Sequence, residues 1–448
     1  MAIAKHPRPP YKTVFFLCCI LLSLVFIQSL IADDVIDKPV CLTSVKDAIL
    51  LAFKNNLAIQ IQEKEVDATR AGIMQARSAI LPQVDFQAAY THNEKVPAQD
   101  IFFGYENNKM VGLSASQVIY DGGASIAAIK QAKLNLNIQV QTLTAQKLDV
   151  EFEAKRLYYG LLLAYETERI TKELFGQAKA HYEDVKNKFE QGTSSKFDLL
   201  QSKIQVAKVV PELIKAKNAI DLIKAEFKKL LKIKMEDELK VTDQLAYLPV
   251  EINEPEFLRI AYLSQPQMNI RALGIDVNKW AIQVARASNR PQINASGNLA
   301  YNTNKLDKMF DASQRNWNAG ISVSIPIFDG FSSKAKVDAA KSRYEESRLQ
   351  KEDTGDQIAV DIRQGCLDLR QSQAIIDYTK DNIDEAKEAL KISEVSYDIG
   401  EGTNLDVLDS QVSLSQVEEN LASAVYDYLM ADAFLNKTMG RLLEGDKK

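Results

Sequence analysis

Apolar residues return every seven positions, or by alternating steps of three and four, over long stretches of the chain. The clearest series is Ile362, Leu369, Ile376, Ile383, Leu390 and Tyr397. A sustained seven-residue repeat keeps one seam of a helix against a neighbour, as in a coiled coil. The pattern predicts long helices at about residues 123–190, 195–232, 331–398 and 403–440. The first would be roughly 100 Å long at about 1.5 Å per residue, so it must lie against other long helices.

Each half of the chain contains two short stretches in which apolar and polar residues alternate. In the first stretch, Val84, Phe86 and Ala88 are separated by Asp85 and Gln87. Alternation with a period of two is typical of a strand that has one apolar and one polar face. The sequence predicts strands at about residues 82–92, 109–119, 291–302 and 316–327. One two-stranded hairpin is therefore expected in each half.

The two halves match each other with an offset of 208 residues. The segment that starts at Gly192 and contains Asp198 matches the segment that starts at Gly400 and contains Asp406. The Asp121-Gly122 and Asp329-Gly330 pairs match at the same offset, and the Pro82 and Pro291 strand starts lie one residue off it. A period this long indicates a two-fold duplication, not a solenoid of short repeats. We divide the chain into repeats 33–240 and 241–448.

Two environments produce strands with one apolar face. A soluble sheet packs that face against a core, whereas a membrane barrel turns it toward lipid and encloses water. Four strands cannot close a barrel alone, and open edges are a liability. Nothing else in the chain is predicted to cover the strands, because their neighbours are very long helices. Several copies that pool four strands each would close a barrel, and three copies give twelve strands, an even number as in bacterial barrels.

The N-terminus has the features of a secretory signal peptide. Lys5, Arg8 and Lys12 precede an apolar stretch from Val14 to Ile31, and the small residue Ala32 follows. We expect cleavage near Ala32, so that residues 1–32 are the signal peptide; an uncleaved membrane anchor is the alternative. The mature chain would retain 52 basic and 60 acidic residues, a net charge of −8 without a basic patch. Nucleic acid is therefore excluded as an expected partner.

The inventory of reactive residues argues against an enzyme. Three histidines are present, His6, His92 and His181, and the first lies in the signal peptide. No zinc-protease, phosphate-loop, paired-cysteine or serine-nucleophile motif occurs, so no metal or cofactor is expected. Outside the signal peptide, Cys41 and Cys366 could form a disulfide in an oxidising compartment, although their spacing does not require one.

The duplicated motifs, taken in order behind a signal peptide, resemble those of the TolC family of outer-membrane efflux proteins over roughly residues 42–440. The resemblance rests on the Leu81-Pro-Gln and Arg290-Pro-Gln strand starts, the Tyr120-Asp-Gly and Phe328-Asp-Gly strand ends, and the tip segment 397–409. It implies a mainly α-helical fold in which a trimeric twelve-stranded transmembrane β-barrel in the outer membrane of a Gram-negative cell continues into a periplasmic α-helical barrel.

The same resemblance implies the function and the partners. Such a channel is the exit duct of a tripartite efflux or type I secretion system, and it contacts outer-membrane lipid. A periplasmic adaptor (membrane fusion) protein and an inner-membrane pump of the RND, ABC or MFS type dock at its closed inner end. Two other classes stay open: a periplasmic adaptor, which would have one helical hairpin between compact β-domains, and a soluble coiled-coil scaffold, which would leave the alternating strands unexplained.

Acidic residues at the hairpin tips are the candidate functional residues. The resemblance places Asp406 and Asp409 at the periplasmic aperture, where three chains would form two carboxylate rings that attract cations. Ser195-x-x-Asp198 and Thr403-x-x-Asp406 also fit helix-capping boxes, a structural role that can coexist with the pore role. Asp409 lies beyond the first turn, and its counterpart is Gln201. Asp409 is therefore the strongest pore candidate.

Tyr397 matches a family tyrosine that holds the aperture shut by hydrogen bonding, and Asp198 would be its partner. Tyr397 also ends the seven-residue seam, so a core aromatic is the alternative. Gly192 and Gly400 are expected to end helices in a left-handed turn. Gly402 occupies a position where the family's gate uses an arginine, so a salt-bridge lock is in doubt and closure would depend on packing or on the carboxylate rings.

Overall fold

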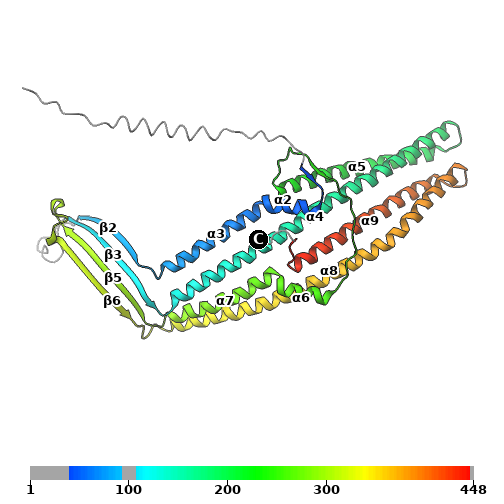
Figure 1. Cartoon of the computed structure of the whole chain (residues 1–448). Coiled ribbons are helices and arrows are strands. Elements are labelled where there is room, and N and C mark those ends of the chain that lie inside the picture. The colour runs from blue at the N-terminus through cyan, green and yellow to red at the C-terminus, as the bar shows by residue number, and fades with distance from the viewer. Residues whose placement is uncertain (1–39, 93–106, 444–448) are drawn as a thin grey trace, which may run out of the picture.

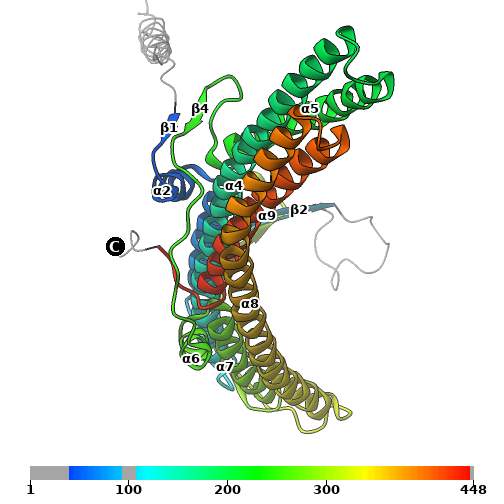
Figure 2. The same cartoon turned by 90° about the vertical axis from the view of Figure 1, so that its right-hand side faces the viewer.

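The computed structural model describes residues 40–92 and 107–443, and side chains from Leu42 onward. The expected signal peptide, residues 1–32, lies outside the described residues. Figure 1 shows an elongated molecule with a four-stranded sheet at one end and the tips of two long helical hairpins at the other. Figure 2, which looks along the molecule from the tips, shows the helices arranged as a curved wall.

The two halves repeat the same order of elements. The first half has α2 (Val45–Asn55), α3 (Leu57–Ser78), β2 (Gln83–His92), β3 (Asn107–Asp121), α4 (Ala124–Glu190) and α5 (Lys196–Leu231). The second has α6 (Glu254–Ser264), α7 (Pro266–Ala287), β5 (Gln292–Thr303), β6 (Arg315–Ser324), α8 (Ser332–Asp398) and α9 (Asn404–Thr438), with short 3₁₀ turns η1 (Leu306–Lys308) and η2 (Ala312–Gln314) between its strands. Both α4 and α8 contain 67 residues.

The sheet is antiparallel, with the order β2-β3-β5-β6. Its register aligns one apolar residue from every strand in a single row: Phe86, Leu113, Leu299 and Trp317. The next row, on the opposite face, is polar: Asp85, Ser114, Asn298 and Asn318. Because side chains alternate between faces along a strand, the sheet has one apolar and one polar surface across its whole width.

Strand β6 ends at Ser324, so the predicted extension to residue 327 is wrong. Ser324 is the last β6 residue that pairs with β5, and Pro326 follows two positions later. Proline has no N–H to donate to a sheet, so the apolar Ile325 and Ile327 continue the alternation without continuing the strand.

A second, parallel sheet was not predicted. It pairs β1 (Val40–Leu42) with β4 (Leu239–Val241), and it joins the start of one repeat to the end of that repeat. Figure 2 shows β1, β4, α2 and α6 together on the convex side of the helical wall. The count of four strands was therefore too low, since the described residues contain six.

Each half has its own hydrophobic core at the middle of the long helices. In the first half, Leu157, Leu161 and Tyr158 of α4 are buried against α2 and α5. In the second, Ile362, Leu369 and Ile376 of α8 are buried against α9. Ile362, Leu369 and Ile376 belong to the predicted seven-residue seam. Cys366 is a buried free thiol within the second core, and the Cys41 side chain lies outside the described side chains.

Candidate functional site

Both hairpin tips have the same turn, built from a glycine and a capping box. Gly192 and Gly400 have φ angles of 78° and 80°, a left-handed conformation that favours glycine after a helix. The Ser195 and Thr403 hydroxyls then accept the N–H groups of Asp198 and Asp406, whose carboxylates accept the cap N–H groups in return. The duplicated residues therefore build the two turns in the same way.

Within one chain, the capping box stabilises the charged form of the Asp406 carboxylate. Hydrogen bonds from the hydroxyl and the backbone N–H of Thr403 lower the pKa of Asp406 below its ordinary value. The Oδ2 atom of Asp406 lies 2.7 Å from the Thr403 hydroxyl and 2.8 Å from its N–H. Asp406 is nevertheless exposed, so its other oxygen is free to face water or a cation.

Asp409 has no structural partner. Its side chain is exposed, and within the described chain no hydrogen bond or ion pair involves it. It lies one turn after Asp406 in α9, beyond the capping box. Its counterpart Gln201 instead accepts a hydrogen bond from Asn404. The capping explanation, which accounts for Asp198 and Asp406, therefore leaves Asp409 unexplained.

Tyr397 packs against the other hairpin of its own chain. Its ring centroid lies 5.2 Å from that of His181 in an edge-on arrangement, and the Nζ atom of Lys188 lies 4.2 Å from the Tyr397 centroid. Lys188 also forms ion pairs with Asp184 at 2.9 Å and Asp398 at 2.8 Å. Within the described chain, no hydrogen bond joins Tyr397 to Asp198, whose carboxylate is occupied by Ser195.

A polar network that was not predicted connects the two tips. The Nε2 atom of His181 in α4 lies 2.7 Å from Oδ1 of Asn404, and Nδ2 of Asn404 donates to Oε1 of Gln201 at 3.1 Å. Asn404 is only 3 % exposed, so its amide is satisfied by these two side chains and not by bulk water. In the sequence, His181 and Asn404 are ordinary polar residues 223 positions apart.

Gly402 is required by the shape of the second tip. A Cβ atom at Gly402 would lie 3.0 Å from Cβ of Ser396 and 3.0 Å from the backbone nitrogen of Tyr397, closer than nearly all real contacts. The Gly402 N–H also donates to the Ser396 carbonyl at 2.9 Å. Any side chain at this position, arginine included, therefore requires its neighbours in the turn to shift by a few tenths of an ångström.

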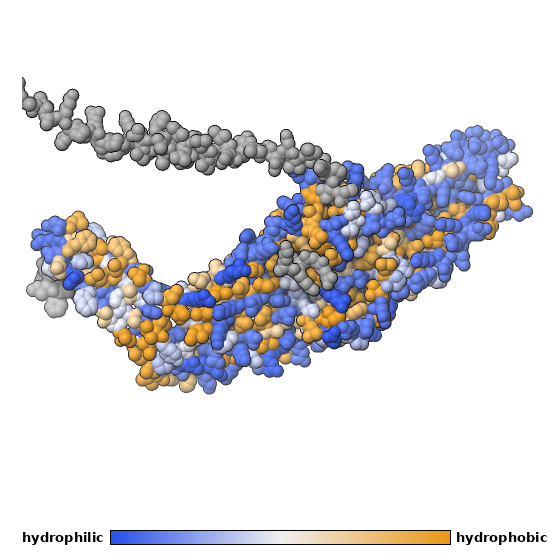
Figure 3. Space-filling model, viewed as in Figure 1, coloured by the Kyte–Doolittle hydropathy of each residue, from blue (hydrophilic) through white to orange (hydrophobic). Residues whose placement is uncertain are grey.

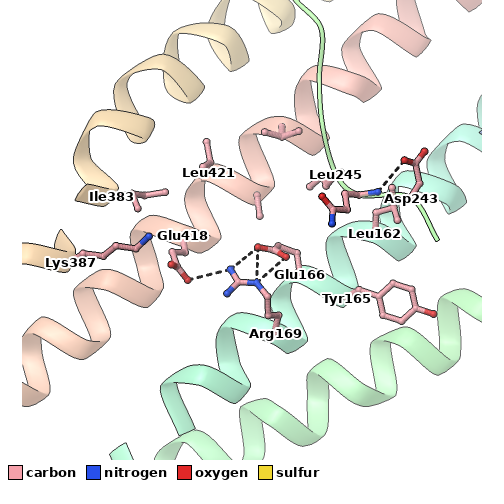
Figure 4. Close-up of a pocket in the computed structure, with 13 residues that line it drawn as sticks. Leu162, Tyr165, Glu166, Arg169, Asp243, Leu245, Ile383, Lys387, Glu418 and Leu421 are labelled. Carbon is pink, nitrogen blue, oxygen red and sulfur yellow. Dashed lines mark hydrogen bonds and ion pairs between the residues drawn. The ribbon is translucent and has the colours of Figure 1, made fainter. Parts of the chain in front are cut away.

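The hairpins also meet midway along their length, around a pocket of about 620 Å³. Figure 4 shows Arg169 reaching from α4 toward Glu418 of α9, with Glu166 beside it and Lys387 of α8 across the pocket. Arg169 lies 2.7 Å from Glu166 and 3.4 Å from Glu418. Hydrogen bonds to Glu166 raise the pKa of Arg169. The charges of this pocket are therefore largely paired, and they join the two hairpins.

Large apolar side chains cover one face of the sheet. Phe86 is 67 % exposed, Trp317 68 % and Ile321 74 %. On the face that Figure 3 presents, apolar residues gather on the strands and at their junction with the helices, whereas the hairpin tips are mostly hydrophilic. A contiguous exposed apolar surface of this kind marks contact with a membrane or a protein.

Two other features, a membrane-spanning helix and a metal site, are absent from the described part of the chain. None of its helices is both long and apolar enough to cross a bilayer. Residues 40–92 and 107–443 contain no group of three or more His, Cys, Asp or Glu side chains placed to hold a metal ion.

Amphipathic strands joined to two hairpins of very long helices define an outer-membrane channel subunit. The family model described as outer membrane efflux protein matches residues 48–231 and 258–441, and the chain belongs to this family. The match has one part in each half of the chain. It confirms the predicted relation to TolC and the outer-membrane location, and it does not favour the adaptor alternative.

Curated relatives and solved structures agree. The outer membrane protein TolC of Vibrio cholerae is 22 % identical over 389 residues, covering 85 % of this chain and 86 % of that protein. The alkaline protease secretion protein AprF of Pseudomonas aeruginosa is 21 % identical over 413 residues, covering 89 % and 85 %. The CmeC outer membrane channel of Campylobacter jejuni has a similar structure, with a TM-score of 0.79, 20 % identity and coverage of 90 % and 87 %.

Proposed function

We propose that three copies of this chain form the outer-membrane exit duct of a tripartite efflux or type I secretion system. The observation that carries the proposal is the sheet, which has an apolar row from Phe86 to Trp317 on one face and a polar row from Asp85 to Asn318 on the other. Such alternation suits a barrel that has lipid outside and water inside. The duct moves solutes and breaks no covalent bond.

The open edges of the sheet support a trimer. Strands β2 and β6 each have one unpaired edge in the described chain. Unpaired edges are unfavourable in lipid, where every backbone N–H and C=O needs a partner within the protein. Joining β6 of one copy to β2 of the next closes the sheet, and three copies supply twelve strands. We assign the two repeats to residues 33–240 and 241–448, behind a signal peptide of residues 1–32.

The hydrophilic end with the hairpin tips is proposed to receive the partners. A periplasmic adaptor and an inner-membrane pump of the RND, ABC or MFS type would dock there, since the sheet places this end farthest from the outer membrane (Figure 1). Among relatives, AprF and the proteases secretion protein PrtF of Dickeya chrysanthemi are named for protein secretion, whereas BepC of Brucella suis is named an efflux protein. The pump determines which cargo enters.

The aperture is proposed to lie at the second tip. Asp406 and Asp409 are both exposed there, and in a trimer each would contribute one carboxylate to a ring. Asp198 and Tyr397 belong to the surrounding contacts, Asp198 as a helix cap and Tyr397 as a ring packed on His181 and Lys188. Gly192, Gly400 and Gly402 give the tips their shape.

Substitutions on the two faces of one strand test the duct. Ile321 lies on the apolar face of β6, and the adjacent Ser322 lies on the polar face. Ile321→Arg places a charge in lipid, at a cost of about 2–4 kcal/mol near the bilayer midplane, so heat-modifiable trimer should be lost from the outer-membrane fraction. Ser322→Arg should assemble and change ion selectivity in planar bilayers. Equal tolerance of both substitutions, or recovery of the wild type in the soluble periplasm, would contradict the proposal.

A further inference from the structure

A basic pocket lies where the helical wall meets the sheet. It has a volume of about 360 Å³ and is formed at the seam between α4 and α7. Its lining includes Ile126, Ala127, Lys279, Trp280, Gln283 and Arg290. Arg290 anchors the pocket to the strand end, because its Nη1 atom donates to the Gly122 carbonyl at 2.8 Å. Gly122 directly follows β3, so the pocket sits immediately beyond the lipid-facing part of the sheet.

Neighbouring subunits would leave this pocket uncovered. Within one chain, α3 packs on α4, α4 on α7, and α7 on α8. Helices α3 and α8 are therefore the edges of the wall at this level, as β2 and β6 are the edges of the sheet. A second copy would join at these edges. The α4–α7 seam lies at the centre of the wall contributed by each chain.

In the proposed barrel, the pocket is assigned to the outward face of the wall. Ile126 is 59 % exposed, and Lys130 and Lys133 follow it on the same face of α4 at the four- and seven-residue spacing. The opposite face of this part of α4 carries Asn135 and Gln139. The uncharged polar pair suits a water-filled duct, whereas an exposed isoleucine beside long basic side chains suits the boundary between lipid and water.

The cations at this seam have no carboxylate partner. The Nζ atom of Lys130 lies 3.9 Å from the centre of the Trp280 ring, a cation–π contact. Among the described residues, no ion pair involves Lys130, Lys279 or Arg290. The nearby Asp121 carboxylate is occupied by the N–H groups of Gly123 and Ser125. Three positive side chains around an interfacial tryptophan therefore lack an anion.

We propose that this pocket binds the phosphate headgroup of an anionic phospholipid, of the phosphatidylglycerol type, in the periplasmic leaflet of the outer membrane. Lys279 and Arg290 line the pocket around the phosphate, and Lys130 lies beside it over the Trp280 ring. The acyl chains run along Ile126 toward the apolar face of the sheet. Tryptophan concentrates at the boundary of a bilayer, and basic pockets between helices there bind acidic headgroups. This proposal rests on the membrane placement proposed above.

The chain contains only two tryptophans, Trp280 and Trp317, so fluorescence can report on the pocket. Trp317→Phe leaves Trp280 as the sole probe in the detergent-solubilised full-length protein. Titration with short-chain phosphatidylglycerol should give a saturable change in emission, which phosphatidylcholine of the same chain length should not give. In the same background, Lys130→Gln with Lys279→Gln should weaken binding about tenfold or more, since each basic residue near an anionic surface contributes about 1 kcal/mol.

The control is Lys334→Gln with Lys336→Gln, two exposed lysines in the first turns of α8 at the same junction. This control should bind phosphatidylglycerol as the parent does. Equal responses to the two lipids, an equal loss in the control, or saturation by inorganic phosphate alone would each overturn the lipid proposal. Outer-membrane recovery and conductance of the Lys130/Lys279 variant should stay normal; if the wild type itself fails to reach the outer membrane, the duct is refuted and not merely the pocket.

Discussion

The Nε2 atom of His181 in α4 lies 2.7 Å from Oδ1 of Asn404, the first residue of α9, so a partly buried hydrogen bond joins the two hairpins at their tips. Nδ2 of Asn404 donates to Gln201, which leaves its Oδ1 to accept from His181. The Nε2 atom of His181 is then the donor of this bond.

Asn404→Ala should favour separation of the hairpins. It leaves His181 and Gln201 without their partner, and an unsatisfied buried group costs about 1–3 kcal/mol, which corresponds to roughly a tenfold shift or more in an open–closed equilibrium. Single-channel recording should show a higher open probability. Asn420→Ala is the control, because Asn420 is an exposed residue of α9 whose side chain, among the described residues, hydrogen-bonds with Gln416 of its own helix alone. An unchanged open probability for Asn404→Ala would show that the network does not hold the tips.

Gly402→Ala should loosen the second tip without adding any charge. The new methyl group would lie 3.0 Å from the Tyr397 backbone nitrogen, and the backbone cannot give way as a flexible side chain would. We expect increased leak currents and faster protease cleavage at the tip. Gly176→Ala in α4 is the matched control, because no atom lies within 4 Å of the added carbon there and alanine stabilises a helix interior by about 1 kcal/mol relative to glycine. Wild-type leak current and protease resistance in Gly402→Ala would contradict the expected steric clash.

The sequence predicted the elements whose signals are local and repeated. The seven-residue series in α8 and the alternation in β2 each extend over many residues, and both elements form where they were expected. The end of β6 was misplaced because Ile325 and Ile327 preserve the alternation while Pro326 ends the hydrogen bonding. The β1–β4 pair was missed because each strand has three residues, too few for a periodic signal.

The candidate site was predictable only in part. The capping boxes at Ser195 and Thr403 could be predicted from the sequence, since each is defined by the spacing of two residues at the start of one helix. The His181–Asn404 contact depends on how two hairpins from opposite repeats pack against each other, and neither residue is distinctive in the sequence. The same holds for Lys188, which lies over Tyr397 only because α4 and α8 are neighbours at the tip.

Asp409→Ala should raise single-channel conductance or weaken block by divalent cations. The carboxylate is exposed and unpaired in the described chain, so its removal costs no internal contact and changes mainly the field in the aperture. Asp409→Glu, which keeps the charge, should restore cation block. Glu401→Ala, at an exposed position of the preceding turn, is the control for a general change in charge near the tip. Wild-type conductance and block in Asp409→Ala would remove Asp409 from the constriction.

Asp432→Asn should stabilise the chain at neutral pH. Burial raises the pKa of Asp432 above its ordinary value, although the Lys155 charge and a hydrogen bond from Asn436 act in the opposite direction. A raised carboxyl pKa means that the charged carboxylate is less stable in the folded than in the unfolded chain. The charged carboxylate therefore lowers the free energy of unfolding at pH 7. This destabilisation disappears as the pH falls through the folded pKa toward the ordinary value of 3.8. Asn436 donates a hydrogen bond to Asp432 at 3.1 Å. In the Asp432→Asn variant, the side-chain oxygen of the new asparagine can accept the same bond.

Thermal unfolding of the solubilised protein, followed by far-UV circular dichroism, measures this effect. The midpoint of Asp432→Asn should exceed that of the wild type at pH 7, and the two midpoints should converge near pH 4. Asp356→Asn in α8 serves as the control for the loss of one carboxylate from an exposed helix face, because Asp356 is exposed. A lower midpoint for Asp432→Asn at pH 7 would mean that attraction to Lys155 outweighs the desolvation of the carboxylate, the reverse of the balance that burial of Asp432 implies.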